Sequence, residues 1–385
     1  MDREKFEERL KELPQETVVL IAARAAVRSF PILTRFGEHD ENSQTIALST
    51  ARAILSSGVA AKFPTAEVMQ FTGRASDAAI AAGVYAGHSH AADAVHAAVN
   101  TANTALTSRV TRAASAKSAV ALAARAATYA AVLPGDAVVT GEEIVVDTAY
   151  AEAAVRTDAL NDVSLSFDKL LSAPAWQNTG EPEWMVSTVG SRDSLLDAGP
   201  EWDFWRRWYR GFLNGDHLDW ELQRRVALIE ENIWEAGPKA VAAEIARIEA
   251  AYEVERRAAD VEESASTALS ERRGIGDNNP PSTIDDALIT SDSTTIIWAA
   301  AQDLREEALA DAPKKSRVVK ALSAIVGVLK ACGLYVATKV DLALDTVIVE
   351  TIKAARVIGT GWLALNTETV QNLVQAVVNW LQFLG

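Results

Sequence analysis

The chain has 385 residues and a formal net charge of −15, and its length exceeds the usual size of one domain, about 100 to 200 residues. Hydrophobic residues make up 49% and aromatic residues only 6%, and much of the hydrophobic share is alanine, which favours close-packed helices over sheets. So large an acidic excess argues against nucleic acid as a partner, because phosphate contacts need a concentrated basic face.

Residues 1–135 are predicted to form an alanine-rich helical bundle. No proline interrupts residues 65–133, which would form a rod about 100 Å long as one helix. Because that is too long for an ordinary domain, we expect breaks near residues 83–87 and 100–108, where glycine, asparagine, threonine and serine gather. Thr65, after Pro64, can cap the helix that follows.

Residues 136–273 are predicted to form an acidic helical unit that contains tryptophan. Seven of the ten tryptophans lie from Trp176 to Trp234. On a helix, the large aromatic residues of 202–212 form one wide stripe with three arginines displaced from it. Such a stripe is typical of core packing with the arginines paired to acids, and the alternative is a platform that stacks on bases or another ligand.

This aromatic segment resembles a family of bacterial proteins with no assigned activity. The similarity lies in Trp-Arg-Arg-Trp-Tyr-Arg-Gly-Phe-Leu-Asn-Gly at 205–215, its continuation at 218–229 and 234–238, and Asn-Asn-Pro-Pro at 278–281. In that family an alanine-rich helical front half precedes the tryptophan-rich segment. The resemblance implies a helical fold and brings no catalytic or binding role with it.

A linker is predicted over residues 274–292. Two glycines and two prolines in the nine residues 274–282 cannot continue a helix. The Gly-Ile-Gly at its start lacks the preceding strand and following Lys-Ser or Lys-Thr of a phosphate-binding loop.

Two groups of polar residues are weak candidates for chemistry. His90, Asp93 and His96 are i,i+3 neighbours and could contribute ligands to a metal, although they spread over a wide arc and no fourth ligand is visible. Polar residues on a partly exposed helix explain them equally well. His217 stands between Asp216 and Asp219, as in acid–base sites, but a turn and a helix cap account for it more simply. We therefore expect no catalytic residue and no cofactor.

Residues 293–385 are predicted to form a basic, amphipathic helical module. At about 100° per residue, a run of apolar side chains shares one arc of a helix that is either continuous or broken near Gly327 and Gly333. The expected membrane or oligomer face comprises Val318, Leu322, Ile325, Leu329, Val336, Val340, Val347, Ile358, Trp362 and Trp380. The expected basic face comprises Lys314, Lys315, Arg317, Lys320, Lys330, Lys353 and Arg356.

This module leaves two uses open. A stripe beside a basic face suits a helix on an anionic membrane, and it equally suits a helical bundle or a homo-oligomer. The leading hypothesis is a non-enzymatic effector or scaffold whose C-terminal helices oligomerise or engage a membrane while the front units meet a protein partner. By architecture it resembles bacterial membrane-damaging defence effectors. The alternatives are a soluble assembly protein with no membrane role and a metal-dependent enzyme.

The expected location is the cytoplasm, with a peripheral position at the inner membrane if the module binds lipid. Residues 1–13 lack the apolar stretch of a signal peptide, and no run of about 18 uncharged apolar residues occurs.

Overall fold

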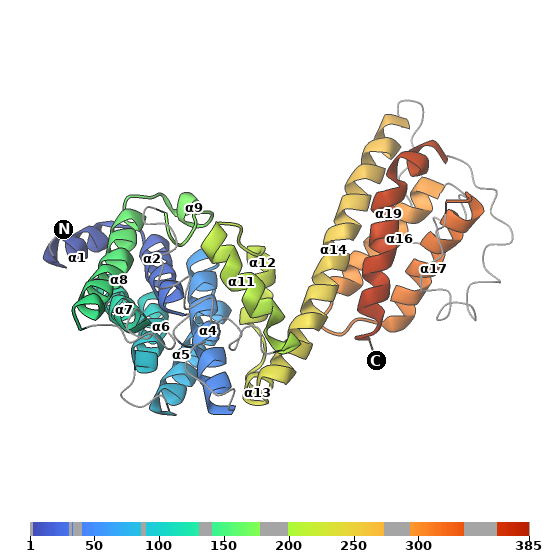
Figure 1. The fold of residues 1–385 in the computed structure, drawn as a ribbon. Coiled ribbons are helices and arrows are strands. Elements are labelled where there is room, and N and C mark those ends of the chain that lie inside the picture. Colours follow the sequence, from blue (N-terminus) through green and yellow to red (C-terminus); the bar gives the residue numbers. More distant parts are fainter. Residues whose placement is uncertain are drawn as a thin grey trace. The chain divides into compact units, whose positions relative to one another are not determined.

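The fold is all-α, as predicted. The computed structural model describes residues 3–30, 33, 41–85, 90–130, 141–177, 199–272, 293–334 and 360–384, and every regular element in these ranges is a helix. The chain divides into two compact units, unit 1 at Met1–Ile245 and unit 2 at Ala246–Gly385 (Figure 1).

The described helices of the front part of unit 1 surround α2, which is the central one. Every residue of α2 from Thr17 to Ser29 is buried, and α2 packs against α4, α6, α7 and α8. A helix covered on all sides is expected to be apolar all round, and from Val18 to Arg28 the two arginines are the exceptions. The bounds are α1 (Arg3–Glu12), α2 (Gln15–Ser29), α4 (Glu41–Lys62), α5 (Ala66–Tyr85), α6 (His90–Leu106), α7 (Arg109–Ala130), α8 (Gly141–Asp162) and α9 (Phe167–Leu170).

The predicted breaks in the alanine-rich segment are confirmed. α5 ends at Tyr85 before α6 begins at His90, and α6 ends at Leu106 before α7 begins at Arg109. The Thr65 hydroxyl accepts a hydrogen bond from the Val68 amide at 3.2 Å, as expected of a cap.

Alanine lets these helices approach closely. The Thr101 hydroxyl of α6 donates to the Ala22 carbonyl of α2 at 3.1 Å, so a short side chain reaches the backbone of the neighbouring helix. Most of the buried side chains between Ala92 and Ala127 are likewise alanine. Helices with small interfacial residues can bring their backbones together without leaving voids.

The aromatic block forms the interior of the second part of unit 1. This part contains the 3-10 helix η2 (Pro200–Trp202) and helices α11 (Asp203–Asn214), α12 (Trp220–Ala227) and α13 (Glu231–Glu235). The core interpretation of the stripe is confirmed, since these aromatic side chains are 4% exposed or less: Trp202, Phe204, Trp205, Trp208, Tyr209 and Phe212.

Unit 1 joins regions that the sequence analysis assigned to different domains. Phe30, at the end of α2, meets the Trp208 ring edge-on at 6.1 Å and the Tyr209 ring at 5.7 Å. Because the front helices and the aromatic block share a core, the predicted division at 135/136 does not separate two compact units.

In its described residues, unit 2 comprises α14 (Pro238–Arg272) from Ala246 onward, α16 (Ser293–Leu309), α17 (Lys315–Ala331) and α19 (Thr360–Leu381) (Figure 1). The unit boundary lies inside α14, and not at the predicted 273/274. The physical reason is that Val254, Ala258 and Val261 of α14 belong to the same hydrophobic core as the three later helices. The predicted linker 274–292 lies outside the described residues.

Only one of the two predicted break positions ends a helix. Gly327 stays inside α17 and is buried, whereas Gly333 has a φ of 68°, a conformation that favours glycine. In α19 the backbone at Asn366 is non-helical, which marks a kink within this helix.

Candidate functional site

Unit 1 contains a cleft with a volume of about 420 Å³. It combines small apolar side chains with both signs of charge, and that volume lies within the usual range for small-molecule sites. Its walls come from α4, α5, α13 and the start of α14. The lining residues are Thr45, Leu48, Ser49, Arg52, Arg74, Asp77, Ala78, Ala81, Ala82, Glu231, Trp234, Glu235, Gly237 and Pro238.

Arg52 is the most constrained charged residue of this cleft. Its terminal nitrogens donate to both carboxylate oxygens of Glu231, at 2.7 and 2.6 Å, and its guanidinium lies over the Trp234 ring at 4.6 Å from the centroid. The hydrogen bond from Arg52 lowers the pKa of Glu231, against the effect of its partial burial. The Arg52 side chain is only 2% exposed, and among the described residues its Nε–H has no hydrogen-bond partner.

Arg74 and Asp77 place a second pair of opposite charges on the cleft wall. They are i,i+3 neighbours on α5 and therefore face the same side of that helix. Arg74 is half-buried and rests over the Phe71 ring at 5.0 Å, and Asp77 is exposed. Within the described part of the chain, neither forms an ion pair with the other or with any other residue.

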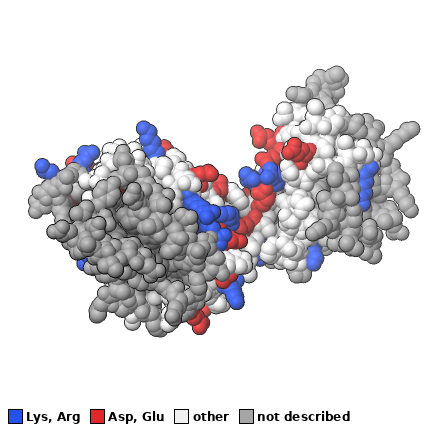
Figure 2. All heavy atoms as spheres, viewed as in Figure 1, with Lys and Arg blue, Asp and Glu red and all other residues white. Residues whose placement is uncertain are grey.

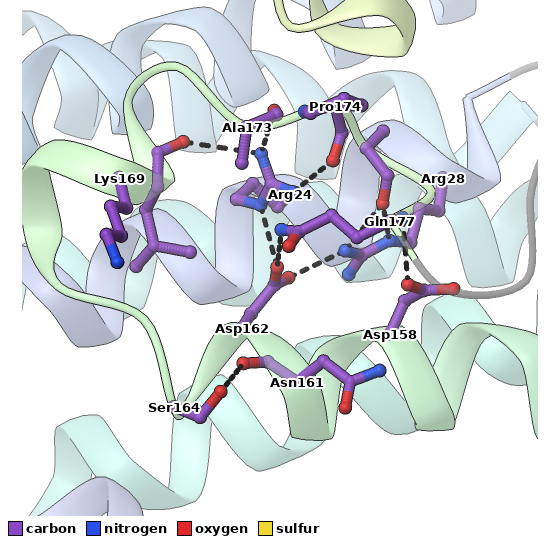
Figure 3. A network of polar contacts seen from close by, with 12 residues as sticks. Arg24, Arg28, Asp158, Asn161, Asp162, Ser164, Lys169, Ala173, Pro174 and Gln177 are labelled. Carbon is purple, nitrogen blue, oxygen red and sulfur yellow. Dashed lines mark hydrogen bonds and ion pairs between the residues drawn. The ribbon is translucent and has the colours of Figure 1, made fainter.

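A buried ion-pair network lies elsewhere in unit 1, around Asp162. Arg24 Nε donates to Asp162 Oδ1 at 3.1 Å and Arg28 Nη2 to Asp162 Oδ2 at 2.7 Å, and all three side chains are 0% exposed. Figure 3 shows the two arginines of α2 and the aspartate at the end of α8 pointing toward one another. Burial lowers the pKa of Arg24, and the charge of Asp162 opposes that shift.

The rest of this network holds the chain after α9 against α2. Arg24 donates to the carbonyls of Ala173 at 2.8 Å and Pro174 at 2.6 Å, and Arg28 donates twice to the carbonyl of Ala175, at 2.9 and 2.8 Å (Figure 3). The hydrogen bonds to Ala175 are buried and those to Ala173 and Pro174 are partly buried, and an unpaired carbonyl away from water would be costly. The arginines therefore act as a structural clamp for the loop.

His217 is partly buried beside this clamp as a neutral base. Its ring packs against the Phe212 ring at 4.3 Å between centroids, and neither ring nitrogen forms a regular hydrogen bond with a described residue. Burial first, and then the positive charge of Arg24, lower its pKa from 6.5 to about 4, with a weaker opposing effect of the Ala173 carbonyl. Asp219 instead caps α12, since its carboxylate accepts from the Glu221 amide at 2.7 Å, as the simpler interpretation predicted.

The structure does not assemble the predicted metal candidates. Asp93 is buried, and both of its oxygens accept hydrogen bonds from Arg125 of α7, one at 2.8 Å. This corrects the prediction for Asp93, because an arginine already occupies the lone pairs that a metal would need. His96 is exposed, and the side chain of His90 lies outside the described residues. In the described ranges no group of three or more His, Cys, Asp or Glu could hold a metal ion.

The predicted membrane or oligomer face is interior wherever the structure describes it. Val318, Leu322, Ile325 and Leu329 are each 0% exposed and pack into the core of unit 2. Trp380 is 0% exposed as well, and Trp362, at 8%, donates from its indole nitrogen to the Ser264 hydroxyl at 3.0 Å. The expectation of a free apolar face is therefore corrected for these residues, because α14, α16 and α19 cover it. Val336, Val340, Val347 and Ile358 lie outside the described residues.

The predicted basic face is partly engaged within unit 2. Arg317 forms ion pairs with three acids of α16, Asp303 at 3.1 Å, Glu306 at 3.2 Å and Glu307 at 2.7 Å. Lys315 donates to the Leu384 carbonyl at 2.9 Å.

The remaining basic residues do not make a visible patch. Lys314, Lys320 and Lys330 are exposed, while Lys353 and Arg356 lie outside the described residues. On the face in view in Figure 2, the basic atoms of unit 2 stand apart from one another, among acidic and uncharged ones. In the ranges that the structure covers, none of the helices has the length and apolarity needed to cross a bilayer.

Sequence reasoning missed both the cleft and the clamp. A signal for the clamp was present, since Arg24 and Arg28 stand four apart in an otherwise apolar helix and point to buried partners. The cleft left no comparable signal, because its walls come from three segments that are far apart in the sequence. Comparison with protein-family models, with curated proteins and with solved structures found no match.

Proposed function

We propose that this chain is a non-enzymatic helical binding protein that acts through the surface of its folded units, and that its C-terminal apolar stripe serves as bundle core. The observation that carries the proposal is the complete burial of Val318, Leu322, Ile325 and Leu329 inside unit 2. A face already covered by three helices of the same unit has no apolar area left to offer to lipid or to another copy.

The charges of unit 2 support the same reading. Arg317 is engaged by three carboxylates, and its pKa is raised first by the hydrogen bond to Glu306. An arginine held by acids of its own unit contributes little to attracting an anionic membrane, since those carboxylates already balance its positive charge. We therefore infer that the binding surface is the cleft of unit 1, which charged groups line.

Vesicle flotation of the full chain tests the proposal. Vesicles of phosphatidylglycerol and of phosphatidylcholine are compared at low and high salt, while hydrogen exchange reports on the amides of α17 (Lys315–Ala331). The expected result is no co-flotation and unchanged protection of α17. Co-flotation with the anionic vesicles, together with loss of that protection, would overturn the proposal.

Light scattering addresses the oligomer alternative. We expect the mass of one chain, 41.3 kDa, at all concentrations. The substitution Ile325→Asp should unfold unit 2, because Ile325 is 0% exposed, and Leu365→Asp should not, because Leu365 is 88% exposed on α19. If the chain is instead an oligomer that Ile325→Asp converts to a folded monomer, the stripe is an interface between copies and the proposal fails.

A further inference from the structure

The cleft of unit 1 has a charge pattern that selects a narrow class of ligand. Arg52 and Glu231 neutralise each other in a bidentate pair, so the charges that remain on the walls are positive at Arg74 and negative at Asp77 and Glu235. A dianion such as a phosphate would be repelled by the two acids, and a polyamine would meet the positive charge of Arg74. A small molecule that carries one positive and one negative charge meets neither penalty.

The polar groups that such a molecule would satisfy are present and unused. Arg52 is not among them, because its side chain is 2% exposed and its terminal nitrogens are held by Glu231. Arg74 and Asp77 face the same side of α5 without pairing in the described part of the chain. A carboxylate can therefore accept from Arg74, while an ammonium group donates to Asp77.

The rest of the cleft suits a short apolar body. Ala78, Ala81 and Ala82 of α5 and Leu48 of α4 line it together with the Trp234 ring. The volume of about 420 Å³ accommodates a molecule of amino-acid size and leaves room for water.

We propose that the cleft between α4, α5 and α13 binds a free amino acid with an uncharged side chain, with its carboxylate on Arg74 and its ammonium on Asp77. This assignment deepens the proposed function and rests on it, since it names the ligand class for the surface of unit 1.

Calorimetric titration of the full chain with the free L-amino acids that have uncharged side chains tests the assignment. At least one should bind with a Kd below about 1 mM. For leucine as the probe, isoamylamine and isocaproate each retain the apolar body and only one of the two charges, and each should bind at least tenfold more weakly. Absence of binding across the panel, or equal binding of either single-charge analogue, would overturn the assignment.

Variants locate the site. Arg74→Gln and Asp77→Asn should each weaken binding by about ten- to a hundredfold, as expected for loss of a charge-assisted contact. Ala81→Phe should abolish binding by filling the cleft, and Ala81 is exposed, so the fold should tolerate the change. The matched control is Arg9→Gln, which removes an exposed arginine paired with Glu12 on α1.

The outcomes separate this assignment from the proposed function. If Ala81→Phe leaves the affinity unchanged, the ligand binds elsewhere and the assignment fails. If nothing in the panel binds while α17 stays protected against exchange in the presence of vesicles, the ligand class is wrong and the proposed function stands. If α17 opens on vesicles, the proposed function fails whatever the titration shows.

Discussion

Replacing Asp162 by asparagine should remove the clamp of unit 1 with almost no change in shape. The carboxylate accepts from Arg24 at 3.1 Å and from Arg28 at 2.7 Å, and all three side chains are 0% exposed. An asparagine keeps one acceptor oxygen but turns an NH2 group toward one of the arginines, so a positive charge is left buried beside a donor.

The magnitude follows from these contacts. Two hydrogen bonds to charged groups contribute about 3–6 kcal/mol together, and removing one partner of a buried ion pair costs about 3–5 kcal/mol. We therefore expect Asp162→Asn to lower the free energy of unfolding of unit 1 by about 4 kcal/mol. That is a large part of the total stability of a typical domain, about 5–15 kcal/mol.

Urea unfolding of the full chain measures this loss. Hydrogen exchange in peptides from α2 (Gln15–Ser29) and α8 (Gly141–Asp162) reports which part of the chain unfolds. The matched control is Asp168→Asn, since Asp168 is exposed on α9 and its change should stay within about 0.5 kcal/mol. If Asp162→Asn costs no more than this control, the ion pairs do not clamp the loop and the reasoning is refuted.

Three further substitutions probe other parts of the fold. The pKa of His217 is lowered from 6.5 to about 4, so between these pH values the unfolded chain binds a proton that the folded chain does not. The free energy of unfolding of unit 1 should therefore fall by about 3 kcal/mol as pH falls from about 6.5 to about 4. In urea titrations at each pH, this pH-dependent loss should be absent in His217→Gln. Gly211→Ala would place its Cβ 2.7 Å from the Asp216 carbonyl oxygen and should lower the free energy of unfolding of unit 1 by about 1–3 kcal/mol in the same assay, and an unchanged midpoint would contradict the close packing seen there. Leu322 is 0% exposed, so Leu322→Ala should lower the free energy of unfolding of unit 2, measured by hydrogen exchange, by about 2–5 kcal/mol. Leu365 is 88% exposed, so Leu365→Ala should leave that free energy almost unchanged. Equal effects would mean that the stripe is not part of the core.

Features set by neighbours in the chain could be predicted from the sequence. The Thr65 cap and the breaks after Tyr85 and Leu106 depend on residues within a few positions, and the structure confirms them. The aromatic stripe of 202–212 was assigned correctly to a core because its helical spacing leaves one continuous apolar side.

Features set by distant residues could not be predicted in the same way. Arg24 and Asp162 are 138 residues apart, and nothing in the local sequence of either selects the other. The stripe through Leu322 and Ile325 shows why function is harder to predict than fold. Periodicity indicates that one face of a helix is apolar, but it does not identify what covers that face. A lipid surface, a second copy and the other helices of unit 2 would all produce the same pattern.

The alanine-lined interior of unit 1 should accept smaller side chains more readily than larger ones. Where Ala22, Ala97 and Ala123 are already 0% exposed, there is little side chain to truncate, and any larger residue must push two helix backbones apart. Substitution scanning of these helices should therefore tolerate glycine or serine far better than valine or leucine, which is the opposite of the tolerance expected in a core built from large aliphatic residues.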